Sequence, residues 1–188
     1  MNGLVHRYFI AVLPPAEISA QARELQTELS EQYQTKGALR SPPHITLHMP
    51  FNWKERKEDE LIKTLSGFIA GSRPFPVFLK DYGVFAPRVI YLKVIQASEL
   101  TKFQHELTRF CRVNLNLLNA TPRNLPYHPH LTLAFRDLKK QEFIKAWEVC
   151  KARSYEAEFV ATSVHLLRHE GIEWKAHHAF DLNDAGHE

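Results

Sequence analysis

The pentapeptide PHITL at residues 43–47 returns almost unchanged as PHLTL at residues 129–133, which lies 86 positions later. The elements predicted around the two copies share a similar offset of about 80 residues, seen for the strands at 8–13 and 89–94 and for the helices that follow them. Such a repeat predicts a duplicated strand–helix–strand–helix unit, with the two copies related by a pseudo-two-fold axis.

Each copy of the pentapeptide is predicted to be a strand, in which alternate side chains point to the same face. His44 therefore shares a face with Thr46, and His130 shares a face with Thr132. The apolar residues between them point to the other face, toward the core of each lobe. A two-fold axis between the copies would bring two imidazoles and two hydroxyls together across one cleft.

This set of side chains suits the chemistry of a phosphodiester. One neutral histidine removes a proton from the attacking water or hydroxyl, and the other, as imidazolium, protonates the leaving oxygen. The threonine hydroxyls donate to the non-bridging oxygens, whose charge must be stabilised through the transition state. The residues do not say which histidine is the acid, and the chemistry requires no metal.

Hydrophobic periodicity predicts strands at 8–13, 44–49, 77–82, 89–94, 130–135, 159–167 and 174–182, and helices over 18–33, 61–69, 100–110 and 143–150. We expect the strand at 44–49 to end at Pro50. No Gly/Ser linker divides the chain. The expected fold is α+β and bilobal, with two pseudo-two-fold-related lobes of mostly antiparallel sheet and flanking helices around a central cleft. One domain would span residues 1–188, with approximate lobes at 1–84 and 85–188 that exchange terminal strands.

The composition excludes several classes of protein. With 44% hydrophobic and 11% aromatic residues among 188, the chain can build a core, which excludes disorder and low-complexity sequence. The formal net charge of +3 is too small for a polybasic nucleic-acid binder. Cys111 and Cys150, the only cysteines, form neither a disulfide scaffold nor a cysteine zinc site. No signal peptide or membrane span is predicted, so a cytoplasmic protein without membrane contact is expected.

The paired His-x-Thr strands resemble the 2H phosphoesterase superfamily, and within it the group of 2′-5′ RNA ligases and RNA 2′,3′-cyclic phosphodiesterases. The opening segment RYFIAV at residues 7–12, followed by Pro14 and Pro15, adds to the likeness, which covers nearly the whole chain. The resemblance implies a catalytic pair, His44 and His130, with phosphate-binding residues Thr46 and Thr132. It also implies activity on RNA ends or small nucleotides, with no cofactor, and we expect a monomer.

One position departs from this family pattern. RNA-processing relatives commonly carry a basic residue five positions after the second histidine, where this chain has Phe135, with Arg136 beside it. Arg136 has the same parity as His130 and would face the cleft if the strand continued. We therefore treat Arg136 as a possible substrate contact.

Other residues are weaker candidates for substrate contact. His48 continues the face of His44 and Thr46, and Tyr8 is an aromatic side chain that could stack a base. Phe85 and Trp53 could do the same, although core packing is the usual fate of an aromatic residue. Arg40 and Lys93, like Arg136, are individual candidates for phosphate contact.

Two alternative functions stay open. The first is a nucleotide-binding or RNA-binding module that keeps the cleft without turnover. The second is a histidine-ligated metalloenzyme, which the many histidines invite, although a strand spreads His44 and His48 about 13 Å apart. Loss of activity on chelation would distinguish the metalloenzyme, and turnover unaffected by loss of either motif histidine would contradict the two-histidine mechanism.

Overall fold

The computed structural model describes residues 3–120 and 125–183, which form an α+β fold. Its strands are β1 (Val5–Val12), β2 (Ile45–Lys54), β3 (Phe75–Phe85), β4 (Val89–Ile95), β5 (His130–Ala134), β6 (Glu156–Ala161), β7 (Ser163–Glu170) and β8 (Glu173–Asp181). Its α-helices are α1 (Ala16–Tyr33), α2 (Glu58–Ile69), α3 (Ser98–Leu115) and α4 (Lys140–Lys151).

Local sequence explains where several helices begin and end. Helix α1 follows the pair Pro14-Pro15, and its C-cap Gln34 adopts the left-handed conformation with φ of 56°. Helix α3 ends in the same way at Asn116, with φ of 54°. The first turn of α2 holds three acidic residues, 58–60, which the helix dipole favours at that end.

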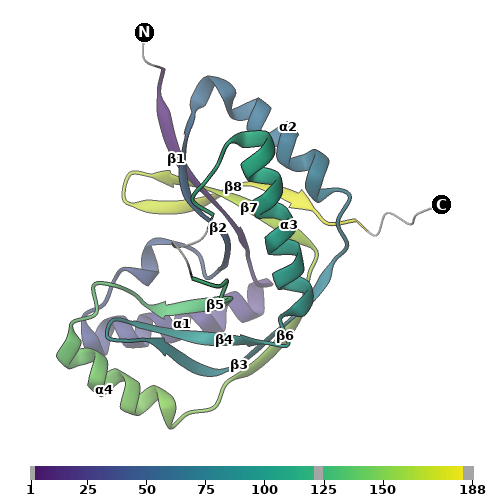
Figure 1. Cartoon of the computed structure of the whole chain (residues 1–188). Coiled ribbons are helices and arrows are strands. Elements are labelled where there is room, and N and C mark those ends of the chain that lie inside the picture. Colours follow the sequence, from purple (N-terminus) through teal and green to yellow (C-terminus); the bar gives the residue numbers. More distant parts are fainter. Residues whose placement is uncertain (1–2, 121–124, 184–188) are drawn as a thin grey trace.

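All strands join one antiparallel sheet in the order β6-β3-β4-β5-β2-β1-β7-β8. The sheet curls and its strands fall into two groups, β6-β3-β4-β5 and β2-β1-β7-β8, which form the two lobes in Figure 1. Each group takes strands from both halves of the sequence. The first group joins β3 to β5 and β6, and the second joins β1 and β2 to β7 and β8. The predicted bilobal α+β fold is confirmed.

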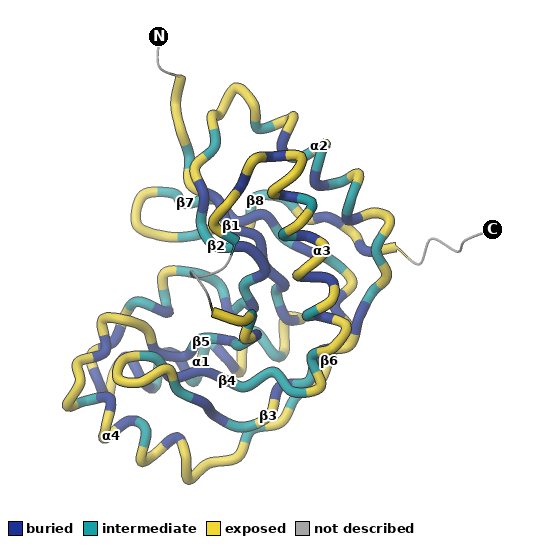
Figure 2. The backbone as a smooth tube through the Cα atoms, in the orientation of Figure 1, coloured by how far each residue is buried: buried dark blue, intermediate teal, exposed yellow. Residues whose placement is uncertain are grey.

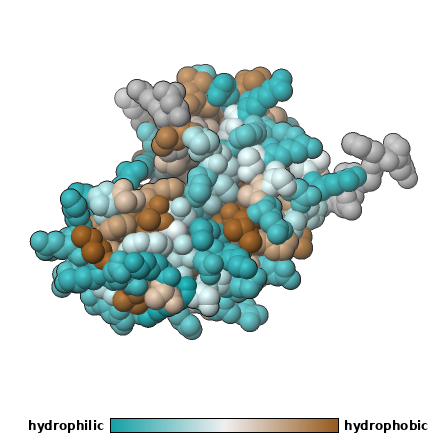
Figure 3. Space-filling model, turned by 60° about the horizontal axis from the view of Figure 1, so that its bottom comes forward, coloured by the Kyte–Doolittle hydropathy of each residue, from teal (hydrophilic) through white to brown (hydrophobic). Residues whose placement is uncertain are grey.

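The main core lies on one face of this sheet. Its buried cluster takes residues from all four helices and from the inner faces of the strands, and these buried segments follow the strands in Figure 2. A separate small cluster, Phe9, Ala11 and Leu167, lies on the other face of β1 and β7, with Leu13 and Trp174 packed against it. The view in Figure 3 shows a mostly hydrophilic surface on which hydrophobic residues form separate patches.

The expectation that Pro50 ends the second strand is wrong. Strand β2 continues to Lys54, and the register with β1 shifts between the pairs Tyr8–Phe51 and Ile10–His48. Pro50 therefore lies in a bulge, where the strand needs no donor from that residue. A second register shift, between the pairs Ile10–His48 and Ala11–Thr46, interrupts the alternation of side chains between Thr46 and His48.

The single strand expected at 159–167 is wrong as well, because the chain forms two strands there. β6 pairs with β3 in one lobe, and β7 pairs with β1 in the other, with Thr162 between them. The sequence carries a signal for this crossing. The less exposed positions of β6 are odd-numbered and end at Ala161, whereas the buried positions that open β7 are Val164 and Leu166.

None of the helices in the described ranges combines the length and the apolar composition that a membrane-spanning helix needs.

Candidate active site

The two motif strands meet at the centre of the sheet, where β2 pairs with β5 through Ile45 and Leu131. Counting outward from this antiparallel pair places His44 opposite Thr132 and Thr46 opposite His130. Ile45 and Leu131 are fully buried in the main core, whereas the four polar side chains are only partly buried. The structure thus brings all four predicted residues onto one face, around an axis between Ile45 and Leu131.

Both histidine rings are anchored in the same way. Nδ1 of His44 lies 2.7 Å from the carbonyl oxygen of Pro42, and Nδ1 of His130 lies 2.7 Å from the carbonyl oxygen of His128. A carbonyl oxygen can only accept a hydrogen bond, so each Nδ1 must carry a proton and donate it. The neutral ring therefore keeps its lone pair on Nε2, which is the atom available to a substrate.

A proline separates each histidine from its carbonyl acceptor. Pro43 and Pro129 are both buried. Proline fixes its own φ and restricts the residue before it to extended backbone, and that residue carries the acceptor carbonyl. The Pro-His pair in both repeats therefore orients the imidazoles, an effect that strand alternation alone does not reveal.

Burial favours the neutral form of both histidines. It lowers the pKa of His44 from 6.5 to about 4, and the positive charges of His130 and Arg23 add to the effect. The pKa of His130 is also lowered, chiefly by burial and further by the neighbouring His128. A phosphate anion between the two rings would favour the charged form and so raise the pKa of either histidine.

Aromatic side chains flank the two histidines. The ring centroid of Phe9 lies 4.8 Å from that of His44, and those of Phe85 and Tyr91 lie 4.9 Å and 5.0 Å from that of His130. The Tyr91 hydroxyl lies 3.1 Å from Nε2 of His128. Of these aromatic residues, sequence analysis singled out only Phe85, because Phe9 and Tyr91 lie in strands that read as core.

Gly83 makes room for the Tyr91 ring on the neighbouring strand. Gly83 pairs with Tyr91 between β3 and β4, and a Cβ at Gly83 would lie only 2.5 Å from Cε2 of Tyr91. Any larger residue would push the ring out of its position beside His130.

Polar side chains hold the motif strands from the core side and from a neighbouring loop. The amides of the buried Gln26 and Gln104 donate to the carbonyl oxygens of Thr132 and Leu47, at 2.8 Å and 3.1 Å. The hydroxyl of Tyr127, three residues before the second histidine, donates to the carbonyl oxygen of Thr46 at 2.9 Å. Each motif is thus supported by residues distant from it in sequence.

Two further groups fix the segment that leads to His44. The Arg23 guanidinium on α1 donates to the carbonyl oxygens of Leu39 and Ser41, at 3.2 Å and 2.7 Å. After the second motif, the Asp137 carboxylate accepts hydrogen bonds from the Thr35 hydroxyl and from the backbone amides of residues 36 and 37. The segment before the first motif is therefore clasped to the turn after the second motif.

The structure does not place His48 or Tyr8 with the motif residues. His48 has no exposed surface and packs against Phe51 in the core, because the register shift between the pairs Ile10–His48 and Ala11–Thr46 breaks the alternation that would put it beside Thr46. Tyr8 is fully buried in the core, and its hydroxyl donates to Glu58. The expectations for His48 and Tyr8 as cleft residues are wrong.

Strand β5 does not continue to Arg136. Strand β5 ends at Ala134, which is buried in the main core, so the alternation that would aim Arg136 into the cleft stops before it. Arg136 is exposed, and its guanidinium carbon lies 5.3 Å from the centroid of the Phe135 ring. Lys93 pairs with His130 across β4 and β5. The indole of Trp53 donates to the carbonyl oxygen of Lys57.

The histidines of the described ranges do not form a ligand set for a metal ion. Within residues 3–120 and 125–183, no group of three or more His, Cys, Asp or Glu side chains is arranged to hold an ion.

Comparisons with known proteins agree with this architecture. A Bacillus pumilus protein named "Putative phosphoesterase" is 26% identical over 183 residues, which cover 96% of this chain and 99% of that protein. A Bacillus cytotoxicus relative of similar name is 29% identical over 176 residues, covering 92% and 95%.

Solved structures share the fold. The crystal structure of apo E. coli LigT superposes with a TM-score of 0.68 at 20% identity, covering 97% of this chain and 100% of that one. The crystal structure of TT0787 from Thermus thermophilus superposes with a TM-score of 0.66 at 21% identity, covering 94% and 97%. The sequence pattern of the 2′-5′ RNA ligase superfamily matches residues 14–173. This chain, with its two-histidine motifs on a LigT-like fold, therefore belongs to the 2′-5′ RNA ligase superfamily of 2H phosphoesterases.

Proposed function

We propose that the protein is a metal-independent phosphodiesterase that acts on 2′,3′-cyclic phosphates or 2′-5′ linkages of RNA ends or nucleotides. The observation that carries this proposal is the matched anchoring of His44 and His130, which leaves Nε2 of each ring to exchange protons with a substrate. The pairing of Ile45 with Leu131 supports one shared site for both rings.

In hydrolysis of a cyclic phosphate, one neutral histidine accepts a proton from water as the water oxygen bonds to phosphorus. The other histidine, as imidazolium, donates its proton to the 2′ or 3′ oxygen whose bond to phosphorus breaks. Thr46 and Thr132 donate hydrogen bonds to the non-bridging oxygens. The oxygen that leaves determines which histidine is the acid. A 2′-5′ linkage forms with the same acid–base pair when a 5′-hydroxyl takes the place of water, bonds to phosphorus and displaces the 3′ oxygen, and cleavage of that linkage is the reverse of this step.

The fold relatives support a nucleotide as the substrate. Crystal structures of E. coli LigT hold 3′-AMP and ATP. In this chain the aromatic rings beside both histidines offer surfaces on which a base can stack. The proposal also takes the protein to be a monomer, since the motifs and their supports come from one chain, and cytoplasmic, since Cys111 and Cys150 are free and buried.

The threonines provide a direct test of the phosphate-binding part of this proposal. We would measure hydrolysis of uridine 2′,3′-cyclic phosphate in EDTA for Thr46→Val, Thr132→Val and the control Thr162→Val, an exposed threonine between β6 and β7. Loss of a hydrogen-bond donor at the phosphate should lower kcat about 100-fold in each motif variant and leave the control unchanged.

Two results would contradict the proposal. Nucleotide binding without turnover of cyclic or 2′-5′-linked substrates by the wild type would favour a binding module. Activity that EDTA abolishes and zinc restores would favour a metalloenzyme.

A further inference from the structure

Trp174 contacts Phe9, the aromatic residue that packs against His44. Phe9 contacts His44 with a centroid distance of 4.8 Å, and Trp174 meets Phe9 edge to face, also at 4.8 Å. Both belong to the small cluster on the face of β1 opposite the main core. Because Trp174 is only partly buried, part of its ring remains available on the same face as the motif histidines.

An exposed arginine lies over this tryptophan. The guanidinium carbon of Arg7 is 5.4 Å from the Trp174 ring centroid, and Arg7 pairs with Asn52 between β1 and β2. Within residues 3–120 and 125–183, the Arg7 side chain forms no hydrogen bond or ion pair beyond this contact with the Trp174 ring. His169 packs against Trp174 with a centroid distance of 4.8 Å.

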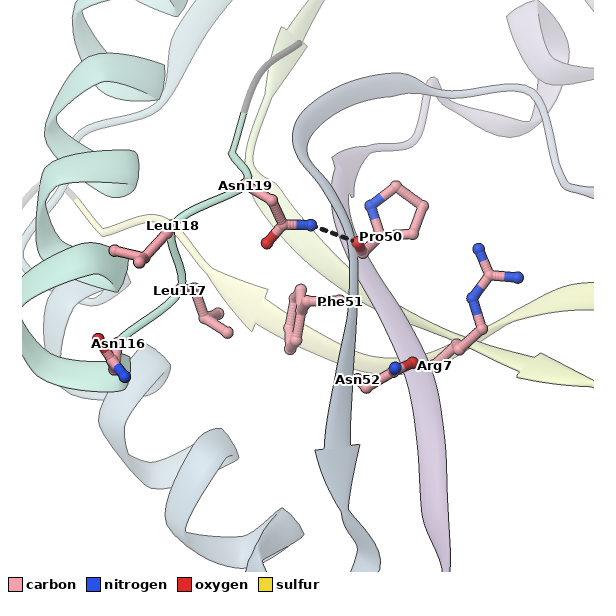
Figure 4. A pocket seen from close by; sticks show the side chains of 8 residues that line it. All are labelled: Arg7, Pro50, Phe51, Asn52, Asn116, Leu117, Leu118 and Asn119. Atoms are coloured by element: carbon pink, nitrogen blue, oxygen red, sulfur yellow. Dashed lines mark hydrogen bonds between the residues drawn. The ribbon is translucent and has the colours of Figure 1, made fainter. Parts of the chain in front are cut away.

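Arg7 also borders a groove of about 500 Å³ beside β2. Figure 4 shows its lining, which includes Arg7, the amides of Asn52 and Asn119 and the apolar side chains of Phe51 and Leu117. In this view the Phe51 ring faces Leu117, whereas the Arg7 side chain extends away from both. Arg7 therefore lies between the groove and the Trp174 ring.

We propose that Trp174 and Arg7 form a subsite for a second nucleotide, so that the preferred substrate is an oligoribonucleotide end rather than a mononucleotide. The inference rests on the proposed function, because it extends the same cleft. The base of the neighbouring nucleotide stacks on Trp174, and Arg7 binds the phosphate that links it to the reacting nucleotide. An aromatic ring with a cation beside it is a sequence-tolerant combination for single strands.

The test compares two substrates on one charge-removing variant. We would measure kcat/KM for uridine 2′,3′-cyclic phosphate and for a tetrauridylate ending in a 2′,3′-cyclic phosphate, with wild type, Arg7→Gln and Arg112→Gln. Arg112 is an exposed arginine on α3 and controls for the lost charge. Arg7→Gln should lower the value for the tetranucleotide about tenfold and change that for the mononucleotide less than twofold. Arg112→Gln should change neither value more than twofold.

Two further measurements test the separate roles of Arg7 and Trp174. Removal of one phosphate contact should reduce the slope of log KM for the tetranucleotide against log salt by about 0.7 in Arg7→Gln. A tetranucleotide with an abasic residue next to its cyclic end should lose about tenfold in kcat/KM on the wild type. Equal losses on both substrates in Arg7→Gln, or no loss on either, would overturn the assignment, as would wild type that tolerates the abasic residue.

Failure of the subsite is distinguishable from failure of the proposed chemistry. Wild type that hydrolyses both substrates with a ratio unaltered in Arg7→Gln overturns the subsite and leaves the chemistry in place. If wild type hydrolyses neither substrate, the chemistry is wrong, and fluorescence anisotropy of a labelled tetrauridylate then decides the subsite. At least fivefold weaker binding by Arg7→Gln would support it, and equal binding would overturn it.

Discussion

His44 and His130 hold the same ring orientation, because Nδ1 of each lies 2.7 Å from the carbonyl oxygen of the residue two positions earlier. Each ring donates its own hydrogen bond from Nδ1 to a backbone carbonyl. Both rings therefore have the same tautomer, with Nε2 free. Two equivalent bases on adjoining strands can act as acid and base in turn once one of them is protonated. The predictions below depend on this arrangement and on the contacts that maintain it.

The pH optimum of kcat/KM should lie on the acid side of neutrality. The reaction needs one protonated and one neutral histidine, and burial holds the pKa of His44 at about 4 and that of His130 below its usual 6.5. The maximum for the free enzyme therefore lies between about pH 4 and 6.5, and log kcat/KM falls with a slope of about −1 above it. The kcat profile should lie at higher pH, because bound phosphate favours imidazolium. A kcat/KM maximum above about pH 7.5 would contradict this account.

The neutral state of His44 also predicts a dependence of stability on pH. The folded-state pKa, about 4, lies below the unfolded value of 6.5, so the unfolded chain takes up a proton first as the pH falls. The contribution is full above about pH 6.5 and is lost as the pH falls toward about 4. We would measure the free energy of unfolding in urea at about pH 7 and at about pH 4.5. The decrease between these two pH values should be about 2 kcal/mol smaller in His44→Gln than in wild type. An equal loss in both proteins would show that burial does not hold His44 neutral.

Gly83→Ala should damage the site through Tyr91. The added Cβ would lie 2.5 Å from Cε2 of the Tyr91 ring, which must then move away from His130. We expect a loss of about 1–3 kcal/mol in the free energy of unfolding, as for other overpacked sites, together with lower kcat/KM on a cyclic nucleotide. Gly67→Ala is the matched control. Gly67 lies in helix α2, and a Cβ added there meets no atom within 4 Å. That variant should be slightly more stable and fully active, and equal behaviour of the two variants would refute the role of Gly83.

Asp137→Ala should release the segment that precedes the first motif. Its carboxylate accepts hydrogen bonds from the Thr35 hydroxyl and from the amides of Lys36 and Gly37, at 2.8 Å, 2.6 Å and 2.8 Å. Hydrogen bonds to a charged acceptor are stronger than neutral ones, so we expect a loss of about 2–3 kcal/mol. Thr35→Val removes one of these bonds and should cost about 1 kcal/mol. Thermal denaturation of both variants would check this order, and a larger loss in Thr35→Val would contradict it.

The motif strands and their shared face could be predicted from sequence because each repeat alternates polar and buried residues over its whole length. Ile45 and Leu131 are fully buried, and the polar residues beside them are not. The same alternation misplaced His48, because the register with β1 shifts between the pairs Ile10–His48 and Ala11–Thr46. Bulges arise from pairing between strands, which the period of one strand does not contain.

Residues that act from distant elements were out of reach for the same reason. Phe9 reaches His44 from the neighbouring strand, and Gln26 supports Thr132 from a helix more than 100 positions earlier. Each has an ordinary place in its own element, a buried strand and one face of α1. Only tertiary packing brings them to the site. The crossing at Thr162 was predictable in principle, because the parity of the inward-facing positions changes there.

The most direct test of the central claim is hydrolysis of uridine 2′,3′-cyclic phosphate in EDTA by wild type, His44→Ala and His130→Ala, with folding of each variant checked by thermal denaturation. An acid–base pair predicts that wild type is active and that each substitution lowers kcat about 100-fold to 10,000-fold. A variant that carries both substitutions should lose no more than this range, because the two histidines act as a unit. Turnover that survives either substitution in a folded protein would contradict the two-histidine mechanism.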